Sequence, residues 1–233
     1  MVPTATTLRS DAVRGRGVKR CALRGRYVIN TKYLLINVSV IKELQRAVAV
    51  DLIRLVIAYY EKRFREGVSA RKLAKLLFLA IYTTDEGTRL LDLPRVRLPE
   101  DFVIYRKGPS IRIGFLLGGA SEIGKHGVVK TGRKYYIKGV DQVLKETSAS
   151  LKGRGLGELA DYVLKIVDKF GQLSERELES YTLDLLGLRD EVAKALVFNM
   201  SLEAYLEGLK RLRKVQESGE YVDEEELYPD LFK

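Results

Sequence analysis

The sequence has few of the residues on which metal, redox and nucleophilic sites depend. Histidine and cysteine occur once each, as His126 and Cys21, and tryptophan is absent from the 233 residues. A single cysteine cannot form an internal disulfide, and a single histidine excludes zinc sites built on two histidines. The segment Gly119–Lys125 has G-x4-G-K spacing, but the Ser or Thr and the helix that should follow are missing. We therefore expect no metal, no cofactor and no catalytic residue. The enzymatic alternative is a carboxylate site without a sequence motif.

Long hydrophobic runs are also missing. The longest apolar segment, Leu73–Tyr82, is interrupted by Lys75 and is shorter than the ~18 residues of a spanning helix. Hydrophobic residues nevertheless make up 46% of the chain and charged residues 31%, which is enough apolar material for a packed core. We expect no contact with a membrane and a location in the cytoplasm. Abundant charge with little Asn, Gln or Met is typical of a thermophile.

Basic residues dominate, and the two ends of the chain carry opposite charge. The net charge is +10, and residues 1–37 hold eight basic side chains against Asp11 alone. Their lack of an apolar period predicts a disordered basic segment, or an extension outside the working domain. Residues 217–233 hold seven carboxylates against Lys233, which predicts a flexible acidic tail. Residues 38–216, with a net charge of +9, are expected to form one mostly helical domain.

Hydrophobic periodicity predicts helices at both ends of this domain. A stripe with i, i+3, i+4 spacing indicates a helix over residues 40–65. Ser69 is positioned to cap a second helix that ends near Thr83, whose second half is apolar all round and should be buried on most sides. Further helices are expected in the last third of the chain, from Leu159 to Phe170, after the Ser174–Glu177 capping box, and after Ser201.

The middle of the chain favours short β structure. A strand is predicted at Phe102–Tyr105, a turn at Gly108-Pro109, and a hairpin near 127–138 whose turn contains Gly132. Ser110 is positioned to cap a helix that runs to about Gly124, although residues 111–117 also alternate as a strand would. Three further expectations are a short strand within 26–38, a long loop over 84–100 and a polar connector over 141–156. The predicted fold class is mainly α with a small antiparallel β element (α+β), a helical domain with a winged-helix-like hairpin.

Residues 102–140 form the strongest candidate for a binding site. They carry eight basic side chains against Glu122 alone, with Tyr105, Tyr135 and Tyr136 among them. The expected residues for binding nucleic acid or a partner are Arg106, Lys107, Arg112, Lys125, Lys130, Arg133, Lys134 and Lys138. A helix followed by a hairpin with a basic tip is the layout of a winged helix, which places the hairpin on phosphates and the helix in a groove. A solvated face opposite a packed one would show the same pattern.

Two short motifs resemble a known family. The segment Lys72-Leu73-Ala74-Lys75-Leu76-Leu77-Phe78-Leu79-Ala80 is similar to the K-L-x-K-L-L-[YF]-x-A helix of the Panacea (antitoxin SocA-like) domain. The strand at 102–105 followed by Gly108-Pro109-Ser110 resembles the strand and turn of that family, and Tyr135-Tyr136-Ile137 resembles its closing hairpin strand. The motif positions are Lys72, Leu73, Lys75, Leu76, Leu77, Gly108, Pro109 and Ser110, and order and spacing agree over roughly residues 38–190.

The resemblance implies a non-enzymatic regulatory domain that binds another macromolecule. Members of the family act as antitoxins that neutralise a partner toxin, or as adaptors that present a partner for proteolysis. The residues themselves leave a second reading open, a winged-helix-like regulator of transcription that binds DNA. Protein and nucleic acid are therefore both expected as partners.

The acidic tail contains more than charge. It includes Tyr221, Leu227, Tyr228, Leu231 and Phe232, which a purely solvating tail does not need. One hypothesis is that the tail folds over the basic side chains of Arg112, Lys130, Arg133, Lys134 and Lys138 and competes with an anionic partner. Simple disorder of the tail is the alternative.

Overall fold

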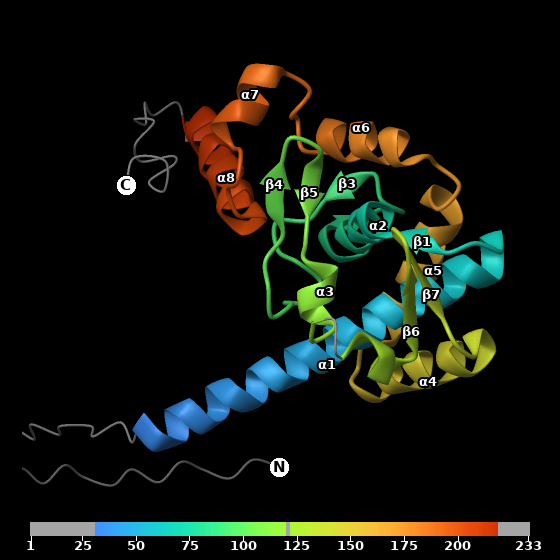
Figure 1. Cartoon of the computed structure of the whole chain (residues 1–233). Coiled ribbons are helices and arrows are strands. Elements are labelled where there is room, and N and C mark those ends of the chain that lie inside the picture. The colour runs from blue at the N-terminus through green and yellow to red at the C-terminus, as the bar shows by residue number, and fades with distance from the viewer. Residues whose placement is uncertain (1–30, 120–121, 219–233) are drawn as a thin grey trace, which may run out of the picture.

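The computed structural model describes residues 31–119 and 122–218, which are mainly helical (Figure 1). The helices are α1 (Thr31–Phe64), α2 (Ala70–Tyr82), α3 (Ile113–Leu116), the 3-10 helix η1 (Ile123–His126), α4 (Val140–Gly153), α5 (Gly157–Phe170), α6 (Glu175–Leu185), α7 (Glu191–Leu196) and α8 (Leu202–Ser218). The strands are β1 (Val68–Ser69), β2 (Thr83–Thr84), β3 (Arg89–Leu90), β4 (Val103–Tyr105), β5 (Gly108–Ser110), β6 (Val128–Thr131) and β7 (Lys134–Ile137). This arrangement confirms the expected class, mainly α with a small antiparallel β element.

The strands form three small antiparallel sheets within the described residues. β1, β7 and β6 make a three-stranded sheet in that order, in which Val68 pairs with Tyr135 and Val128 pairs with Ile137. β2 pairs with β3, and β4 pairs with β5. The hairpin expected near 127–138 is thus confirmed as β6–β7, and its tip lies beside β1 and the start of α2 (Figure 1).

Helix α2 occupies the centre of the fold. All of its residues from Leu73 to Tyr82 are buried, and it packs against α1, α5, α6 and β5. The Ser69 hydroxyl accepts a hydrogen bond from the Lys72 backbone N–H at 3.2 Å, so the expected N-cap is confirmed. A helix that is apolar on every side must be enclosed by other elements, and the remaining helices provide that enclosure.

The first helix is longer than its periodicity indicated. α1 begins at Thr31, so the helix starts earlier than residue 40, and the expected strand is wrong for residues 31–38. A run rich in β-branched and aromatic residues suits a strand only where a partner strand can pair with it, whereas a helix satisfies its own backbone. The N-terminal part of α1 extends away from the body, and Val40, Ile41 and Leu44 are exposed there (Figure 1).

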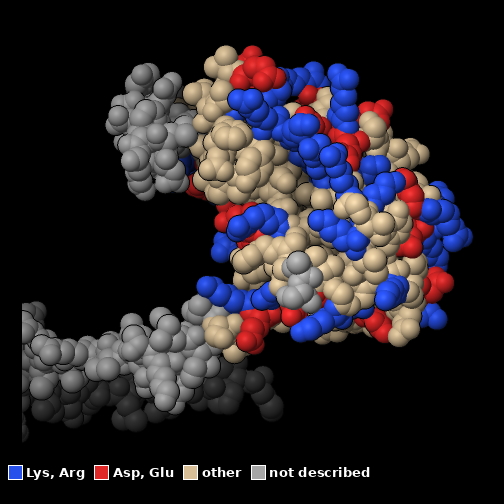
Figure 2. All heavy atoms as spheres, viewed as in Figure 1, with Lys and Arg blue, Asp and Glu red and all other residues tan. Residues whose placement is uncertain are grey.

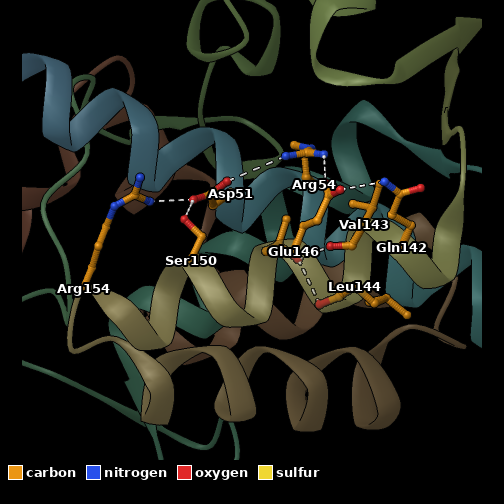
Figure 3. A network of polar contacts seen from close by, with 9 residues as sticks. Asp51, Arg54, Gln142, Val143, Leu144, Glu146, Ser150 and Arg154 are labelled. Atoms are coloured by element: carbon orange, nitrogen blue, oxygen red, sulfur yellow. Dashed lines mark hydrogen bonds and ion pairs between the residues drawn. The ribbon is translucent and has the colours of Figure 1, made fainter.

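The polar connector expected over 141–156 is wrong, because most of it is helix α4. Val143, Thr147 and Leu151 recur at four-residue spacing and are buried, while most of the residues between them are polar. This stripe packs α4 against α1. The two helices are also joined by polar contacts, in which buried Asp51 accepts hydrogen bonds from the Ser150 hydroxyl at 2.7 Å and from Arg154 at 2.5 Å (Figure 3). The high polarity of the segment concealed its one apolar face.

The helix expected from Ser110 to about Gly124 is also wrong. Ser110 ends β5 instead of capping a helix, and α3 covers only four residues, with no side-chain cap at Arg112. Gly118 and Gly119 have φ values of +87° and +85°, a left-handed conformation that ends a right-handed helix. The 84–100 segment is mostly loop, as expected, but contains β3. Helix α7 was not expected, while the capping box of α6 is confirmed.

The structure covers only part of the two terminal segments for which predictions were made. Helix α8 extends to Ser218, so the first two residues of the expected tail are helical. The basic segment 1–30 and the acidic residues 219–233 lie outside the described residues. Within the described part of the chain, none of the helices combines the length and the apolar character needed to cross a membrane.

The burial of α2 predicts the effect of shortening its side chains. Leu76 and Leu77 are 0% and 1% exposed, so Leu76→Ala or Leu77→Ala should lower the free energy of unfolding by about 2–5 kcal/mol. Urea denaturation of each variant measures the change. Leu93→Ala is the control, because Leu93 is exposed and its loss should cost within about 0.5 kcal/mol. Equal effects at all three positions would contradict the central place of α2.

Candidate functional site

The eight basic residues expected to form one site do not form one continuous patch. Three of them already have carboxylate partners: Lys134 pairs with Glu66 at 2.7 Å, Lys125 with Glu122 at 2.8 Å, and Arg112 with Glu100. The hydrogen bond from Lys134 is the main reason why the pKa of Glu66 is lowered. Figure 2 shows Lys and Arg side chains spread over the body of the molecule and interleaved with Asp and Glu.

The other five basic residues are more available for binding. Arg106 and Lys107 lie in the turn between β4 and β5, Lys130 and Arg133 lie at the tip of the β6–β7 hairpin, and Lys138 follows β7. All five are exposed, and the described structure gives none of them an ion pair. The ammonium group of Lys130 lies 5.9 Å from the centroid of the Tyr135 ring. These residues belong to separate elements, so only the tertiary structure decides which of them meet.

A groove beside the N-terminus of α2 brings three of the expected residues together. One hollow of about 190 Å³ is lined by Arg71, Lys75, Tyr105, Lys107, Gly108, Ser110, Glu175 and Glu179. A second of about 270 Å³ is lined by Ser69, Ala70, Arg71, Lys130, Gly132, Arg133 and Glu175. Because the two hollows share Arg71 and Glu175, we treat them as one feature and call it the Arg71 groove.

The Arg71 groove contains residues that the sequence analysis missed. Arg71 from α2 and Glu175 from α6 face each other across it, with 3.8 Å between their charged groups. Lys107, Lys130 and Arg133 line the groove, whereas Arg106, Arg112, Lys125, Lys134 and Lys138 do not. No local pattern around Arg71 or Glu175 distinguishes them from other surface charges, so the sequence held no signal for their meeting.

Lys75 forms the floor of the groove. Its ammonium group is buried and donates hydrogen bonds to the backbone carbonyls of Lys107 and Pro109, the second at 2.7 Å. Desolvation lowers the pKa of Lys75 to about 7, and the carboxylate of Glu179 opposes this shift. Gly108 has a φ of +80°, and a Cβ there would lie 3.0 Å from the Lys75 nitrogen. Glycine is therefore required where the turn passes over the lysine.

The family-motif positions are structural in this protein. Lys72 donates to the Gly171 carbonyl at 3.0 Å and to the Tyr60 hydroxyl at 3.1 Å, so it joins α2 to the end of α5. Leu73, Leu76, Leu77, Gly108 and Pro109 are buried, and Ser110 lines the Arg71 groove. Both lysines of the motif thus act as donors to distant backbone carbonyls. The resemblance concerns residues that hold the fold together and not a set of surface contacts.

A second surface adjoins the groove and is apolar. Tyr105, Val192, Leu196 and Phe198 are 40%, 68%, 62% and 50% exposed, and we call them the Phe198 surface. The rings of Tyr105 and Phe198 lie 6.0 Å apart in an edge-to-face arrangement, and Val192 and Leu196 are one turn apart on α7. Uncharged atoms cover much of the region of β4 and α8, with both basic and acidic side chains at its border (Figure 2). Tyr105 belongs to both surfaces, so they are continuous.

Backbone contacts fix the position of the Phe198 surface. The Asn199 N–H donates to the Ile104 carbonyl at 2.8 Å, and the Ile104 N–H donates to the Met200 carbonyl at 2.9 Å. Asn199 adopts a left-handed conformation with a φ of +66°, which non-glycine residues other than Asn and Asp rarely adopt. The chain therefore turns sharply after α7 and places Phe198 against β4. This surface was not expected from the sequence, because the six-residue helix α7 was not predicted.

The described residues contain no group of three or more His, Cys, Asp or Glu side chains that could hold a metal ion. His126 lies in η1, and burial is the main reason why its pKa is lowered. Comparison of the chain with protein-family models, curated proteins and solved structures gives no match. The resemblance to the Panacea domain therefore rests on the sequence motifs alone.

The buried Lys75 predicts a specific pH dependence of stability. In the folded protein the pKa of Lys75 is about 7, whereas the ordinary value is 10.5, so the unfolded chain binds more protons between these two pH values. The free energy of unfolding of the wild type should therefore rise with pH across this window, relative to that of Lys75→Met. Chemical denaturation at a series of pH values measures the difference. Lys130→Met, at an exposed site, should follow the wild type. Parallel curves for the wild type and Lys75→Met would contradict the prediction.

Proposed function

We propose that this protein is a non-catalytic interaction protein that binds a partner protein through the Phe198 surface. The observation that carries the proposal is the edge-to-face contact of Tyr105 and Phe198, which are 40% and 50% exposed. Helix α7, which directly precedes Phe198, adds the exposed side chains of Val192 and Leu196. The proposal agrees with what the resemblance to antitoxin-type domains implies, which is neutralisation or presentation of a protein. Exposed apolar groups of this kind mark a contact surface, because water around them is released on binding.

The composition of the surface indicates what the partner must offer. Aromatic side chains and arginine are enriched at the centres of protein interfaces, and the Phe198 surface has Tyr105 and Phe198 with Arg106 and Lys107 beside them. Arg106 and Lys107 are exposed and would favour carboxylates on the partner. We therefore expect a partner segment that combines apolar side chains with acidic ones.

A photo-cross-linker tests the partner and the surface together. Phe198→benzoylphenylalanine, illuminated in cells that produce the full chain, should form an adduct with another protein. Phe115→benzoylphenylalanine is the matched control, because Phe115 is also an exposed phenylalanine, 54% accessible, but lies on α3. The adduct should survive nuclease treatment. Adducts of equal yield at both positions, or none at position 198, would contradict the proposal.

A second candidate function is binding of nucleic acid in the Arg71 groove. The observation that favours it is that Lys107, Lys130 and Arg133 line one groove with Arg71, and the first three have no ion pair in the described part of the chain. A winged helix also needs an exposed helix for the groove of the duplex, but α2 is buried from Leu73 onward. Contacts of the hairpin would therefore reach the phosphate backbone and carry no sequence information.

Charge reversal at the hairpin tip tests the second candidate. Lys130→Glu with Arg133→Glu should weaken duplex binding. It should also make the decrease of log binding constant with log salt concentration less steep, by about 1 in slope for each phosphate that the hairpin no longer neutralises. Lys62→Glu with Lys125→Glu is the control, since it changes the net charge equally at exposed residues outside the groove. Fluorescence anisotropy at several salt concentrations measures both. Equal effects in the two double variants would show only a non-specific charge effect and would contradict the hairpin site.

A further inference from the structure

The sequence after α8 contains a segment whose chemistry fits the Phe198 surface. We propose that residues 219–233 bind to the Phe198 surface of the same chain and compete there with the partner protein. This inference rests on the proposed function in that it uses the same surface, but it can be tested without a partner. It assigns an occupant to an apolar surface that is uncovered by the described residues.

The segment offers the combination of groups that the surface requires. Residues 219–233 contain six carboxylates against Lys233, and five large apolar or aromatic side chains are placed among them: Tyr221, Leu227, Tyr228, Leu231 and Phe232. The surface presents Tyr105 and Phe198 for apolar contact, with the basic residues of the β4–β5 turn at its edge. Apolar and charged groups are therefore complementary on the two sides.

The two acidic residues at the start of α7 are engaged within that helix, which weakens their repulsion of other carboxylates. The Asp190 side chain accepts hydrogen bonds from the backbone N–H groups of Val192 and Ala193 at 2.9 and 3.1 Å. Glu191 pairs with Lys194 at 2.7 Å. Arg106 and Lys107, in contrast, are exposed and have no ion pair among the described residues. They remain available to carboxylates of residues 219–233.

The length of the segment matches the distance that it must cover. Ser201 forms a β-bridge with Val103, and α8 starts at the next residue, so the helix begins beside β4. A helix of 17 residues is ~25 Å long at 1.5 Å per residue. The chain after Ser218 must therefore cover about this distance to return to the start of α8, beside β4. Leu227 and Phe232 follow Ser218 by 9 and 14 residues. At ~3.3 Å per residue, the chain between can span about 30 to 46 Å.

The structure favours this position over the basic hairpin that the sequence analysis considered for the tail. Of the five basic residues considered there, Arg112 and Lys134 are already paired with Glu100 and Glu66. None of the large exposed apolar side chains that the structure describes lies on the hairpin. The aromatic groups of residues 219–233 would find no large exposed apolar side chain on the hairpin and only Phe115 beside Arg112, whereas the Phe198 surface provides several.

Binding within one chain needs little intrinsic affinity. A segment tethered by a short flexible linker has an effective concentration in the millimolar range, so a weak contact suffices for occupancy. The exposed charge pairs contribute little each and are screened by salt, so the apolar contacts should carry most of the binding. A partner protein with similar chemistry must then displace residues 219–233, which raises its apparent dissociation constant.

The lack of tryptophan in the chain allows a direct test. Tyr228→Trp in the full chain gives a single tryptophan, which can be excited selectively over the remaining tyrosines and whose quenching by acrylamide reports its exposure. We expect the introduced indole to be shielded relative to an isolated peptide of residues 219–233 with the same substitution. Adding Phe198→Ser should raise the quenching constant to that of the peptide. Phe115→Ser, which removes an exposed phenylalanine on α3, should leave it unchanged.

Further variants keep the test decisive. If Phe198→Ser lowers the melting temperature strongly, Val192→Ser with Leu196→Ser removes the α7 part of the surface at exposed positions. Arg106→Glu with Lys107→Glu should release the indole in part, and more at low than at high salt. Shielding equal to that of the peptide would overturn the inference. So would shielding that depends on protein concentration, because residues 219–233 would then bind a second copy.

The outcomes separate this inference from the proposed function. A shielded indole at position 228, without a cross-link from position 198 to another protein, would retain the intrachain contact and remove the partner. A cross-link to another protein in cells, with the indole at position 228 fully exposed in the purified chain, would support the partner protein and overturn the intrachain contact.

Discussion

The structure depends on the enclosure of one helix that contains a lysine. From Leu73 to Tyr82, every residue of α2 is removed from solvent, and the ammonium group of Lys75 is removed with them. A buried ammonium group is costly unless it donates hydrogen bonds. The carbonyls of Lys107 and Pro109 accept these hydrogen bonds. The burial of α2 therefore requires the β4–β5 turn to lie where its carbonyls reach Lys75. Pro109 has no N–H to satisfy, and Gly108 leaves room for the lysine.

The two candidate surfaces follow from this arrangement. The β4–β5 turn, held over Lys75, places Lys107 in the Arg71 groove and Tyr105 at its edge. Backbone hydrogen bonds between Ile104 and the segment after α7 then bring Phe198 against Tyr105. A cationic groove and an apolar surface are therefore joined at one turn. The choice between a nucleic acid and a protein as partner is a choice between two adjoining parts of the same face.

Polar contacts between the helices serve a different purpose from those at the groove. Asp51 on α1 accepts hydrogen bonds from Ser150 and Arg154 near the end of α4, and Arg54 reaches Glu146 at 3.3 Å (Figure 3). Asp51 is 8% exposed, and these donors supply the hydrogen bonds that a buried carboxylate needs. Because the buried stripe of α4 consists of Val143, Thr147 and Leu151 alone, these contacts help to fix the register of the two helices.

The sequence by itself determined those features that a few neighbouring residues decide. The cap at Ser69, the capping box of Ser174 and Glu177, and the hairpin around Gly132 were predicted correctly, because their hydrogen bonds join residues at most a few positions apart. The burial of α2 was predicted because its apolar residues surround the helix axis. The conformation of residues 111–119 was not, since their pattern suited both a helix and a strand. The helical state of residues 141–153 was not predicted either, because the high polarity of the segment concealed its one apolar face.

Only the tertiary structure decided which basic residues are free and which apolar residues are exposed. Glu66 neutralises Lys134 from 68 positions away, and Arg71 meets Glu175 across α2 and α6, so no local pattern could have shown either pair. Leu196 and Phe198 resemble core residues in sequence, yet they remain exposed because no described segment folds over them. The physical reason is that hydrogen bonds within a helix or turn form between neighbours. Burial and charge pairing depend instead on which distant segment packs above a side chain.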